Sequence, residues 1–328
     1  MFEMRNETQI NDLRMSAVIC TYRSAATLPE AIESLLFQSI PSDQYEIIVV
    51  DNNSQDETPT IVQRFSQNNP VRIRYEFEST QGLSHARNKG LRLASAEIIA
   101  FLDDDAIAEQ GWLESLLDIY DHLSEAWAVG GKVLPIWGGE RPKWFRDSML
   151  RSLSIVDWGD VPRPLKWPER LIGTNCSFRK KVFSEVGLFA TNLGRKGGRL
   201  LGHEDTEIQE RIRKMGKLVF FTPRAVVHHH VPRERLSKAY FYRRAYGTGR
   251  SEAILVSRQA GCKALLKQVI QLGPRLLLKY YHLLATIKQE NSRFQMYTEL
   301  SYQFGFLYQA IKTILTDRGV SAQAIEND

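Results

Sequence analysis

Short apolar runs alternate with amphipathic segments through the first 125 residues, and this alternation restricts the fold more than any other feature of the chain. The apolar runs, expected as strands, cover 15–20, 45–50 and 97–102, and 71–77 alternates in polarity like a further strand, the third in chain order. The amphipathic segments, expected as helices, cover 28–39, 58–68, 82–94 and 112–123. Strands that are apolar throughout are buried on both faces, so the pattern predicts an α/β fold. We expect a mostly parallel, Rossmann-like sheet flanked by helices.

Carboxylates follow two of these expected strands. Asp51 follows the second strand, and Asp103, Asp104 and Asp105 follow the fourth. In sheets of this kind ligands bind beyond the carboxyl ends of the strands, so both groups are expected at one crevice. Along an extended chain Asp103 and Asp105 point the same way, which suits a hard divalent cation that also binds substrate phosphates. The cluster would equally suit an acidic cap of the following helix.

A second acidic pair, Glu204 and Asp205, lies before an expected helix over 208–214. A carboxylate in this position could take a proton from an attacking hydroxyl. The alternative is an N-terminal cap, which the helix dipole favours.

Three consecutive histidines, His228, His229 and His230, occupy an expected strand over 226–231. Neighbours in a strand face opposite ways, so either His229 alone or His228 together with His230 shares a face. A neutral imidazole is a good ligand for ions such as Mn²⁺. A histidine cluster at the surface would fit the same pattern.

The C-terminal third is basic, with 13 Lys and Arg against 3 Asp and Glu over 233–293. Such an excess suits phosphates, anionic membranes and nucleic acids alike. The segment 265–287 resembles an amphipathic helix on an anionic bilayer, with an interruption expected at Gly273-Pro274. A helical hairpin with exposed Lys and Arg is the alternative. We recognise no nucleic-acid module and expect no nucleic-acid partner.

The sequence gives no sign of targeting or of a membrane span. The N-terminal tail, 1–14, lacks an apolar core, and no run of 18 uncharged apolar residues occurs. Three widely spaced cysteines favour a reducing compartment. We therefore expect a cytoplasmic protein, in peripheral contact with the inner face of the cell membrane if its basic C-terminal region lies on the bilayer.

Seven motifs together resemble the family 2 glycosyltransferases of the GT-A fold, over about residues 15 to 250. They are VICTYR (18–23), IVVDNNSQDET (48–58), GLSHARNKG (82–90), FLDDD (101–105), GTNCSFR (173–179), GHED (202–205) and PRAVVHH (223–229). Each motif alone is weak, but the ordered set is specific.

This resemblance implies a donor site for a nucleoside-diphosphate sugar. The residues it implies for donor binding are Thr21, Tyr22, Arg23, Asp51, Asn53, Arg87, Asn88, Asp103, Asp104 and Arg235. Among them Asp51 would contact the base, Asp104 would orient the sugar, and Arg235 would stabilise the departing diphosphate. The implied ligands of Mn²⁺ or Mg²⁺ are Asp103, Asp105 and His229, although His228 or His230 could replace the last.

The resemblance also implies an acceptor side. Asp205 would be the catalytic base, and Glu204 would support it or contact the acceptor. The residues implied for acceptor binding are Gly173, Thr174, Asn175 and Trp137. We expect a helix directly after the first three. The tryptophans 137, 144, 158 and 167 are dense enough that at least one is expected to stack on a sugar ring or to fill the core under the loops.

The combined prediction is an inverting, metal-dependent glycosyltransferase. Its donor would be a nucleoside-diphosphate sugar, first of all a UDP-sugar, and its acceptor a saccharide or a lipid-linked saccharide in bacterial polysaccharide or glycolipid assembly. We expect a nucleotide-sugar half over 15–130, an acceptor half over 131–235 and a basic helical region over 236–328. A nucleotidyltransferase would need a glycine-rich phosphate loop, which the sequence lacks. A scaffold that binds nucleotide sugar or nucleic acid without catalysis is the alternative.

Overall fold

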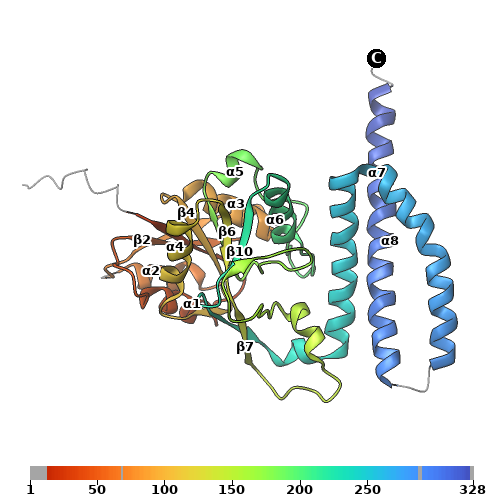
Figure 1. Cartoon of the computed structure of the whole chain (residues 1–328), viewed down its shortest axis with the longest axis horizontal. Coiled ribbons are helices and arrows are strands. Elements are labelled where there is room, and N and C mark those ends of the chain that lie inside the picture. The colour runs from red at the N-terminus through yellow and green to blue at the C-terminus, as the bar shows by residue number, and fades with distance from the viewer. Residues whose placement is uncertain (1–12, 68, 287–289, 326–328) are drawn as a thin grey trace, which may run out of the picture. The chain divides into compact units, whose positions relative to one another are not determined.

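A computed structural model describes residues 13–67, 69–286 and 290–325 of the chain (Figure 1). By packing, the chain divides into two compact units. The first unit comprises the chain up to Ile136 together with Leu153–Phe189 and Asp205–Val231. The second comprises Trp137–Ser152, Ala190–Glu204 and the chain from Pro232 onward. The functional halves expected from the sequence, with borders at 130 and 235, stay a prediction.

The first unit is built on a sheet of eight strands among the described residues, in the order β3-β2-β1-β4-β9-β6-β10-β8. The strands are β1 (Met15–Thr21), β2 (Tyr45–Asp51), β3 (Arg72–Phe77), β4 (Ile98–Asp103), β6 (Ala126–Gly130), β8 (Arg163–Pro164), β9 (Asn175–Arg179) and β10 (Leu218–Phe221). The first four strands are parallel to one another, and β9 lies antiparallel between β4 and β6. The expected mostly parallel sheet is confirmed.

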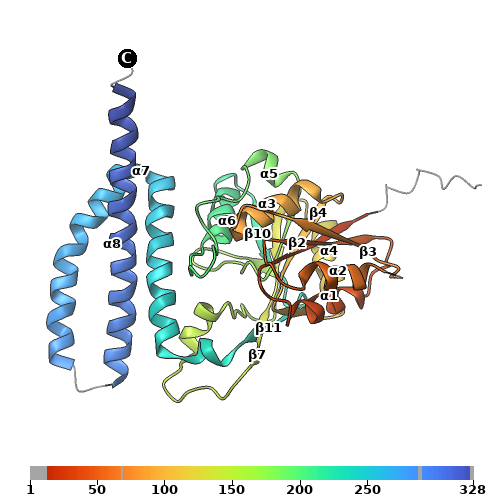
Figure 2. The same ribbon diagram turned by 180° about the vertical axis from the view of Figure 1, so that it is seen from behind.

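Helices cover both faces of this sheet (Figures 1 and 2). They are α1 (Leu28–Leu36), α2 (Thr58–Ser66), α3 (Leu83–Leu93), α4 (Trp112–His122), α5 (Val182–Glu185) and α6 (Glu204–Lys214). Alternation along β1 assigns the faces, because Ala17 and Ile19 pack with α1, α2 and α4 while Val18 packs with α3, α5 and α6. All three β1 side chains are fully buried, which explains why β1 is apolar at consecutive positions.

A second, three-stranded sheet has the order β5-β11-β7. Its strands are β5 (Ala106–Ala108), β7 (Val133–Trp137) and β11 (Val227–Val231). Because β5 follows β4 after two residues, the antiparallel pairing of β11 with β5 brings a distant part of the chain to the end of β4. The strand over the three histidines is confirmed, but its partner β5 was not expected.

The helix expected directly after Gly173-Thr174-Asn175 is wrong. Residues 175–179 form β9, which fills the place between β4 and β6. The reason lies in burial, since Cys176 and Phe178 are both fully buried in the core between the sheet and its helices. In a strand, residues two positions apart point to the same face, so Cys176 and Phe178 enter the same core cluster. In a helix, residues two positions apart point in different directions.

The second unit is mainly helical, as expected for the C-terminal region. It contains α7 (Lys238–Thr286), α8 (Glu290–Ile325) and the 3₁₀ helix η2 (Arg233–Leu236). It also contains the 3₁₀ helix η1 (Asp147–Leu153) except for the last residue, which belongs to the first unit. Both views show α8 between the two arms of α7 (Figures 1 and 2). Side chains from all three segments share one apolar cluster, which includes Ala253, Leu265 and Phe306.

The interruption expected at Gly273-Pro274 is wrong. Helix α7 continues through Pro274, and its arms meet at Gly261, whose φ of 76° and ψ of 173° are not helical. A positive φ is accessible to glycine at little steric cost, whereas proline in a helix removes one backbone hydrogen bond. The bend therefore forms at the glycine, where the backbone can turn.

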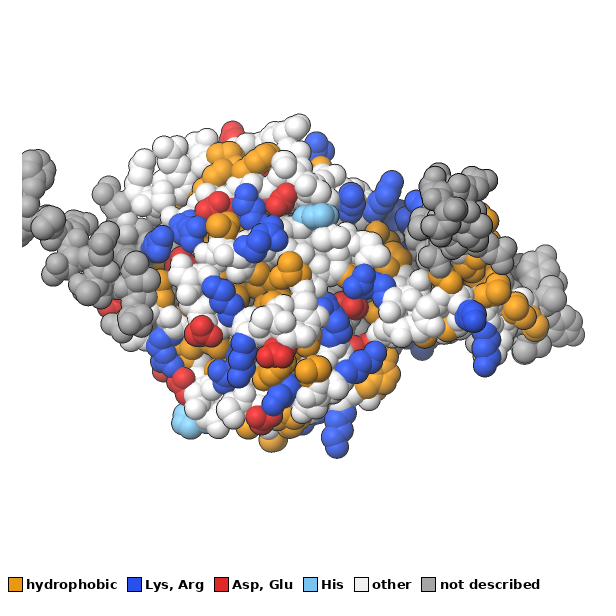
Figure 3. All heavy atoms as spheres, turned by 90° about the horizontal axis from the view of Figure 1, so that it is seen from above, with side chains coloured by type: hydrophobic (Ala, Val, Ile, Leu, Met, Phe, Trp, Pro, Cys, Tyr) orange, Lys and Arg blue, Asp and Glu red, His pale blue; other side chains and the backbone are white. Residues whose placement is uncertain are grey.

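On the face drawn in Figure 3, Lys and Arg side chains lie among Asp and Glu side chains. No described helix has the length and apolar content needed to cross a membrane. The side chains of 275–292, which include the expected membrane-facing Arg275, Lys279 and Lys288, lie outside the described residues, as does most of the tail 1–14.

Candidate active site

Two aspartates and one histidine meet at the carboxyl end of β4. Asp103 ends that strand, Asp105 follows two residues later, and His229 lies on β11, where it pairs with Ala106. One ligand atom from each of the three lies within 4.8 Å of the others. His229 is only 2% exposed, and its Nε2 lies 3.3 Å from Oδ1 of Asp105. Two carboxylates and an imidazole form a donor set that suits Mn²⁺ or a similar ion.

The two neighbouring histidines point elsewhere. Nε2 of His228 lies 2.9 Å from Oε1 of Glu109, and Nε2 of His230 lies 2.8 Å from Oε2 of Glu30. Both are more exposed than His229. This is the alternation expected of a strand, and it singles out His229 as the histidine beside the aspartates.

Asp103 is held from two sides. The hydroxyl of Thr174 donates a hydrogen bond of 2.5 Å to its Oδ2, and the Arg87 guanidinium lies 3.5 Å from its Oδ1. Arg87 is 2% exposed and lies over the rings of Phe101 and Phe189. A side chain at Gly173 would collide with it, since an added Cβ would lie 2.4 Å from the guanidinium. Thr174 and Arg87 thus each contact one carboxylate oxygen of Asp103 and together fix its orientation.

Asp104 faces the loop after β1, where the backbone N–H of Tyr22 donates to its Oδ2 at 3.2 Å. Desolvation raises the pKa of the Asp104 carboxyl to about 7, and the negative charge of Asp105 adds to the rise. A cation bound by Asp103 and Asp105 would oppose this shift, because positive charge favours the ionised carboxylate.

The loops after β1 and β2 are joined to each other. The backbone N–H of Arg23 donates to the hydroxyl of Ser54 at 3.0 Å. Asp51, 2% exposed, accepts hydrogen bonds from the Ser54 N–H and the Tyr75 hydroxyl, both at 2.9 Å. Arg23 and Asn53 adopt positive φ values of 55° and 67°. Such backbone is uncommon outside glycine and recurs at functional loops.

The residues proposed for the nucleotide line these loops. Thr21 ends β1 and is buried, and Tyr22 follows it with the Arg23 guanidinium 5.3 Å from its ring centroid. Asp51 ends β2, directly alongside Thr21 in the parallel register. Their adjacency at one sheet edge is what a nucleotide pocket requires.

One short loop connects Asp205 to the cluster of Asp103, Asp105 and His229. The backbone N–H of Gly173 donates to Oδ2 of Asp205 at 2.9 Å, while the next residue, Thr174, holds Asp103. The other Asp205 oxygen accepts the N–H of Thr206 at 2.7 Å within the first turn of α6. Asp205 is partly exposed. Consecutive residues thus fix both carboxylates, and sequence reasoning missed this link.

Two asparagines lie in the interior, although the sequence predicts that they contact the donor or the acceptor. The amide of Asn175 receives the indole N–H of Trp112 and donates to the carbonyls of Lys132 and Ala225. Asn175 is fully buried and joins β9 to its surroundings. The resemblance predicted that Asn175 binds the acceptor substrate. Its side chain has no exposed atom for that contact.

Asn88 is likewise 4% exposed. Its amide donates to the Phe189 carbonyl at 2.9 Å and accepts from the Phe189 N–H at 3.0 Å. We expect Asn88→Ala to lower the free energy of unfolding by about 3 kcal/mol, because two buried backbone groups would lose their partner. Urea denaturation measures this, with the exposed Asn192→Ala as control, expected within about 0.5 kcal/mol of the parent. Full stability combined with weakened nucleotide binding would instead support the donor role.

Three predicted site residues belong to the second unit. Glu204 is 6% exposed and begins α6, Arg235 is partly buried in η2, and Trp137 packs against Phe145 with the Arg141 guanidinium 5.4 Å from its ring centroid. Their roles stay predictions.

The other tryptophans differ in exposure. Trp144 packs against Phe241 and Phe294 in the second unit. In the first unit, Trp158 donates its indole N–H to the carbonyl of Arg170, and Trp167 is 60% exposed. Trp167 therefore has the most accessible ring for a sugar among these three.

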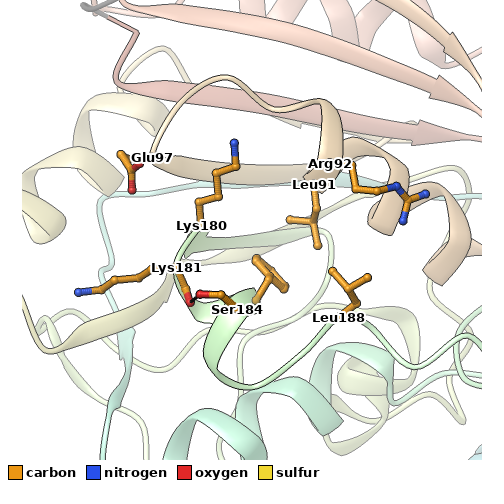
Figure 4. Close-up of a pocket in the computed structure, with 8 residues that line it drawn as sticks. Leu91, Arg92, Glu97, Lys180, Lys181, Ser184 and Leu188 are labelled. Carbon is orange, nitrogen blue, oxygen red and sulfur yellow. Dashed lines mark hydrogen bonds between the residues drawn. The ribbon is translucent and has the colours of Figure 1, made fainter.

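A cavity of about 430 Å³ lies at the other end of the sheet (Figure 4). Its lining includes Glu97, directly before β4, and Lys180, directly after β9. Leu91 and Leu188 face each other across it. Since β4 ends at Asp103, about 20 Å further along an extended strand than Glu97, this cavity is separate from the carboxylate cluster.

Known proteins similar to this chain are glycosyltransferases. The family model described as glycosyl transferase family 2 matches residues 16–187. Glucosyl-dolichyl phosphate glucuronosyltransferase of Haloferax volcanii is 29% identical over 246 residues, which cover 74% of this chain and 77% of that protein. Succinoglycan biosynthesis protein ExoM of Rhizobium meliloti is 30% identical over 263 residues, or 78% of each.

A solved structure shows the same fold. The mannosyltransferase PcManGT from Pyrobaculum calidifontis, in complex with GDP-Man and Mn²⁺, aligns with a TM-score of 0.57 at 22% identity. The alignment covers 93% of this chain and 87% of that one. The parallel sheet, its flanking helices and the ordered motifs are thus those of the GT-A fold, and since the family model spans more than half of the chain, the protein belongs to the family 2 glycosyltransferases.

Proposed function

We propose that the protein transfers a sugar from a nucleoside-diphosphate donor to a hydroxyl acceptor, with a bound divalent cation and inversion at the anomeric carbon. One observation carries this proposal. Gly173 and Thr174, consecutive in the chain, hold Asp205 and Asp103 by one hydrogen bond each. A partly exposed carboxylate is thereby fixed beside a cluster suited to bind a metal and a diphosphate.

Asp205 is the proposed general base. Each of its two oxygens accepts a hydrogen bond from a backbone N–H group. These bonds fix the orientation of the carboxylate and leave further lone pairs for the proton of the acceptor hydroxyl. As the hydroxyl attacks the anomeric carbon, a lone pair of Asp205 takes its proton. A single displacement on the face opposite the diphosphate inverts that carbon, and Glu204 is proposed to support the base or the acceptor.

The proposed metal ligands are Asp103, Asp105 and His229. Burial of His229 and the clamp on Asp103 by Thr174 and Arg87 preorganise them. When bound, a divalent cation would neutralise negative charge on the diphosphate leaving group. The donor set favours Mn²⁺ over Mg²⁺, because imidazole is a poor ligand for magnesium.

We propose a UDP-sugar as donor, bound through Thr21, Tyr22, Arg23, Asp51 and Asn53, with Asp104 toward the sugar. The proposed acceptor is a saccharide or a lipid-linked saccharide. In support, the similar proteins carry names that refer to glucosyl-dolichyl phosphate and to succinoglycan biosynthesis. These names support our proposal of a cytoplasmic enzyme of polysaccharide or glycolipid assembly, in contact with the inner face of the cell membrane where its acceptor is lipid-linked.

Thermal unfolding with a panel of nucleoside diphosphates and their sugars, each with Mn²⁺ or with EDTA, tests the proposal. A ligand at about 100 times its dissociation constant stabilises the folded state by about 2.7 kcal/mol. We expect a higher midpoint for uridine nucleotides with Mn²⁺ and a return to the ligand-free midpoint with EDTA. An unchanged midpoint for every nucleotide would contradict the donor assignment. A metal-independent shift would contradict the metal assignment alone.

A further inference from the structure

The second unit contains a cavity of about 590 Å³ that the proposed transfer does not use. Three arginines and three tyrosines supply half of its lining: Arg199, Arg243, Arg250, Tyr240, Tyr242 and Tyr246. None of the residues that line it is acidic. Three guanidinium groups without a lining carboxylate create a positive potential inside the cavity, which selects for an anion.

Several lining groups are available to a ligand. Arg199 and Arg243 are exposed, and within the described residues their guanidinium groups form no hydrogen bond or ion pair. Arg250 is fixed by Gln309, whose side-chain oxygen accepts from it at 3.0 Å. Tyr240 is 5% exposed, yet its buried hydroxyl has no hydrogen-bond partner among the described residues. An unsatisfied buried hydroxyl costs free energy, so a polar ligand atom there would be favoured.

The wall formed by 198–201 is held firmly against α7. The Arg244 side chain donates to the Leu200 carbonyl at 3.1 Å. Two residues after Leu200, the backbone N–H of Gly202 donates to the Ser251 hydroxyl at 2.9 Å. At Gly247 an added Cβ would lie 2.2 Å from the Leu200 oxygen, so only glycine permits this approach. These contacts fix the position of the segment 198–201. The proposed base, Asp205, lies four residues after this segment in the sequence.

An apolar stripe on α8 begins at the cavity. Phe304 lines the cavity and is 57% exposed, and Tyr308, Ile311 and Leu315 continue from it with 47–63% exposure. Their spacing of four, three and four residues places them on one face of the helix. Exposed apolar residues in a row mark a binding surface more often than scattered ones do. The stripe is continuous with the cationic cavity through Phe304.

We propose that this cavity binds the phosphate or diphosphate of a lipid-linked acceptor, whose hydrocarbon chain lies along the stripe. Arginine is suited to phosphate because its planar fork donates two parallel hydrogen bonds. The tyrosine rings supply apolar surface and hydroxyl groups to the atoms next to the phosphate. Anion binding here stands by itself, while the role as acceptor subsite rests on the proposed function.

Calorimetric titration of the full chain in EDTA, with submicellar farnesyl diphosphate, inorganic pyrophosphate and farnesol, tests this inference. We expect farnesyl diphosphate to bind more tightly than pyrophosphate, and farnesol to bind weakest. The double substitution Arg199→Gln with Arg243→Gln should weaken the affinity for farnesyl diphosphate by about 100-fold, since each lost charged hydrogen bond is worth about a factor of ten. The control is Lys263→Gln with Lys267→Gln, two exposed lysines of α7 outside the cavity, expected to bind as the parent does.

Unchanged affinity in the arginine variant would overturn the site. Equal affinity for pyrophosphate and farnesyl diphosphate would overturn the lipid part. Displacement of farnesyl diphosphate by phosphatidylglycerol vesicles would assign the cavity to bulk membrane headgroups and overturn the acceptor part. Donor binding is measured separately with UDP and Mn²⁺, and the arginine variant should retain it. A parent protein that binds farnesyl diphosphate but no nucleotide would refute the proposed function and leave the anion site standing.

Discussion

Asp205→Asn is expected to lower the turnover number by about 10³-fold while donor binding stays unchanged. The substitution keeps the size of the side chain and one oxygen for the Gly173 N–H. It removes the lone-pair basicity that accepts the proton of the acceptor hydroxyl, and a general base contributes about 10²–10⁴-fold to rate. Initial rates at saturating donor and acceptor measure the effect, with nucleotide binding recorded on the same protein.

The neighbouring carboxylate offers a matched control. Glu204→Gln changes the same chemical group one residue away, at the start of the same helix. We expect a smaller loss, because Glu204 is assigned to support rather than to proton transfer. If Asp205→Asn kept the parent rate and Glu204→Gln abolished it, the two roles would have to be exchanged. If both variants kept the rate, the base would lie elsewhere.

His229→Ala is expected to abolish the Mn²⁺-dependent stabilisation by nucleotide and to reduce turnover by about 100-fold or more. Removal of residues that only orient metal ligands already costs 10–100-fold, so loss of a ligand costs at least as much. His228→Ala is the matched control, since that ring lies on the other face of β11 beside Glu109. It should respond to Mn²⁺ as the parent does.

His229 is a cleaner probe of the metal than Asp103. Arg87 is buried beside Asp103, so Asp103→Ala would remove a negative charge next to a buried cation and would lower stability as well as activity. A loss of activity there would mix folding with metal binding. Retained Mn²⁺ response in His229→Ala, together with a lost response in His228→Ala, would move the ligand role to the adjacent histidine.

The sequence was sufficient for the four parallel strands β1 to β4, because burial on both faces of the central ones leaves a plain pattern. Ala17, Val18 and Ile19 are apolar since each side chain meets a helix layer, and this pattern is readable without structure. Asp51 and Asp103 were placed at one sheet edge by the same reasoning, and the parallel register of β1, β2 and β4 confirms it.

Other features depend on contacts between residues far apart in the chain, which local patterns do not contain. The pairing of β11 with β5 decides which histidine joins the aspartates, and β5 is only three residues long. Asn175 has the polarity of a ligand-binding residue, yet three interior hydrogen bonds satisfy it. The bend at Gly261 was missed because proline is the stronger helix breaker on average, while the backbone here bends at glycine.

The path of the chain limits how this enzyme could be re-engineered. The chain passes between the two compact units five times, at 136/137, 152/153, 189/190, 204/205 and 231/232. A version shortened to Val231 would strip Trp144 of Phe241 and Phe294, and would deprive Leu193 of Ile254. The C-terminal helices are therefore not a detachable module. Replacement of the second unit by that of a relative would require three segments to be exchanged together, namely 137–152, 190–204 and everything from 232 onward.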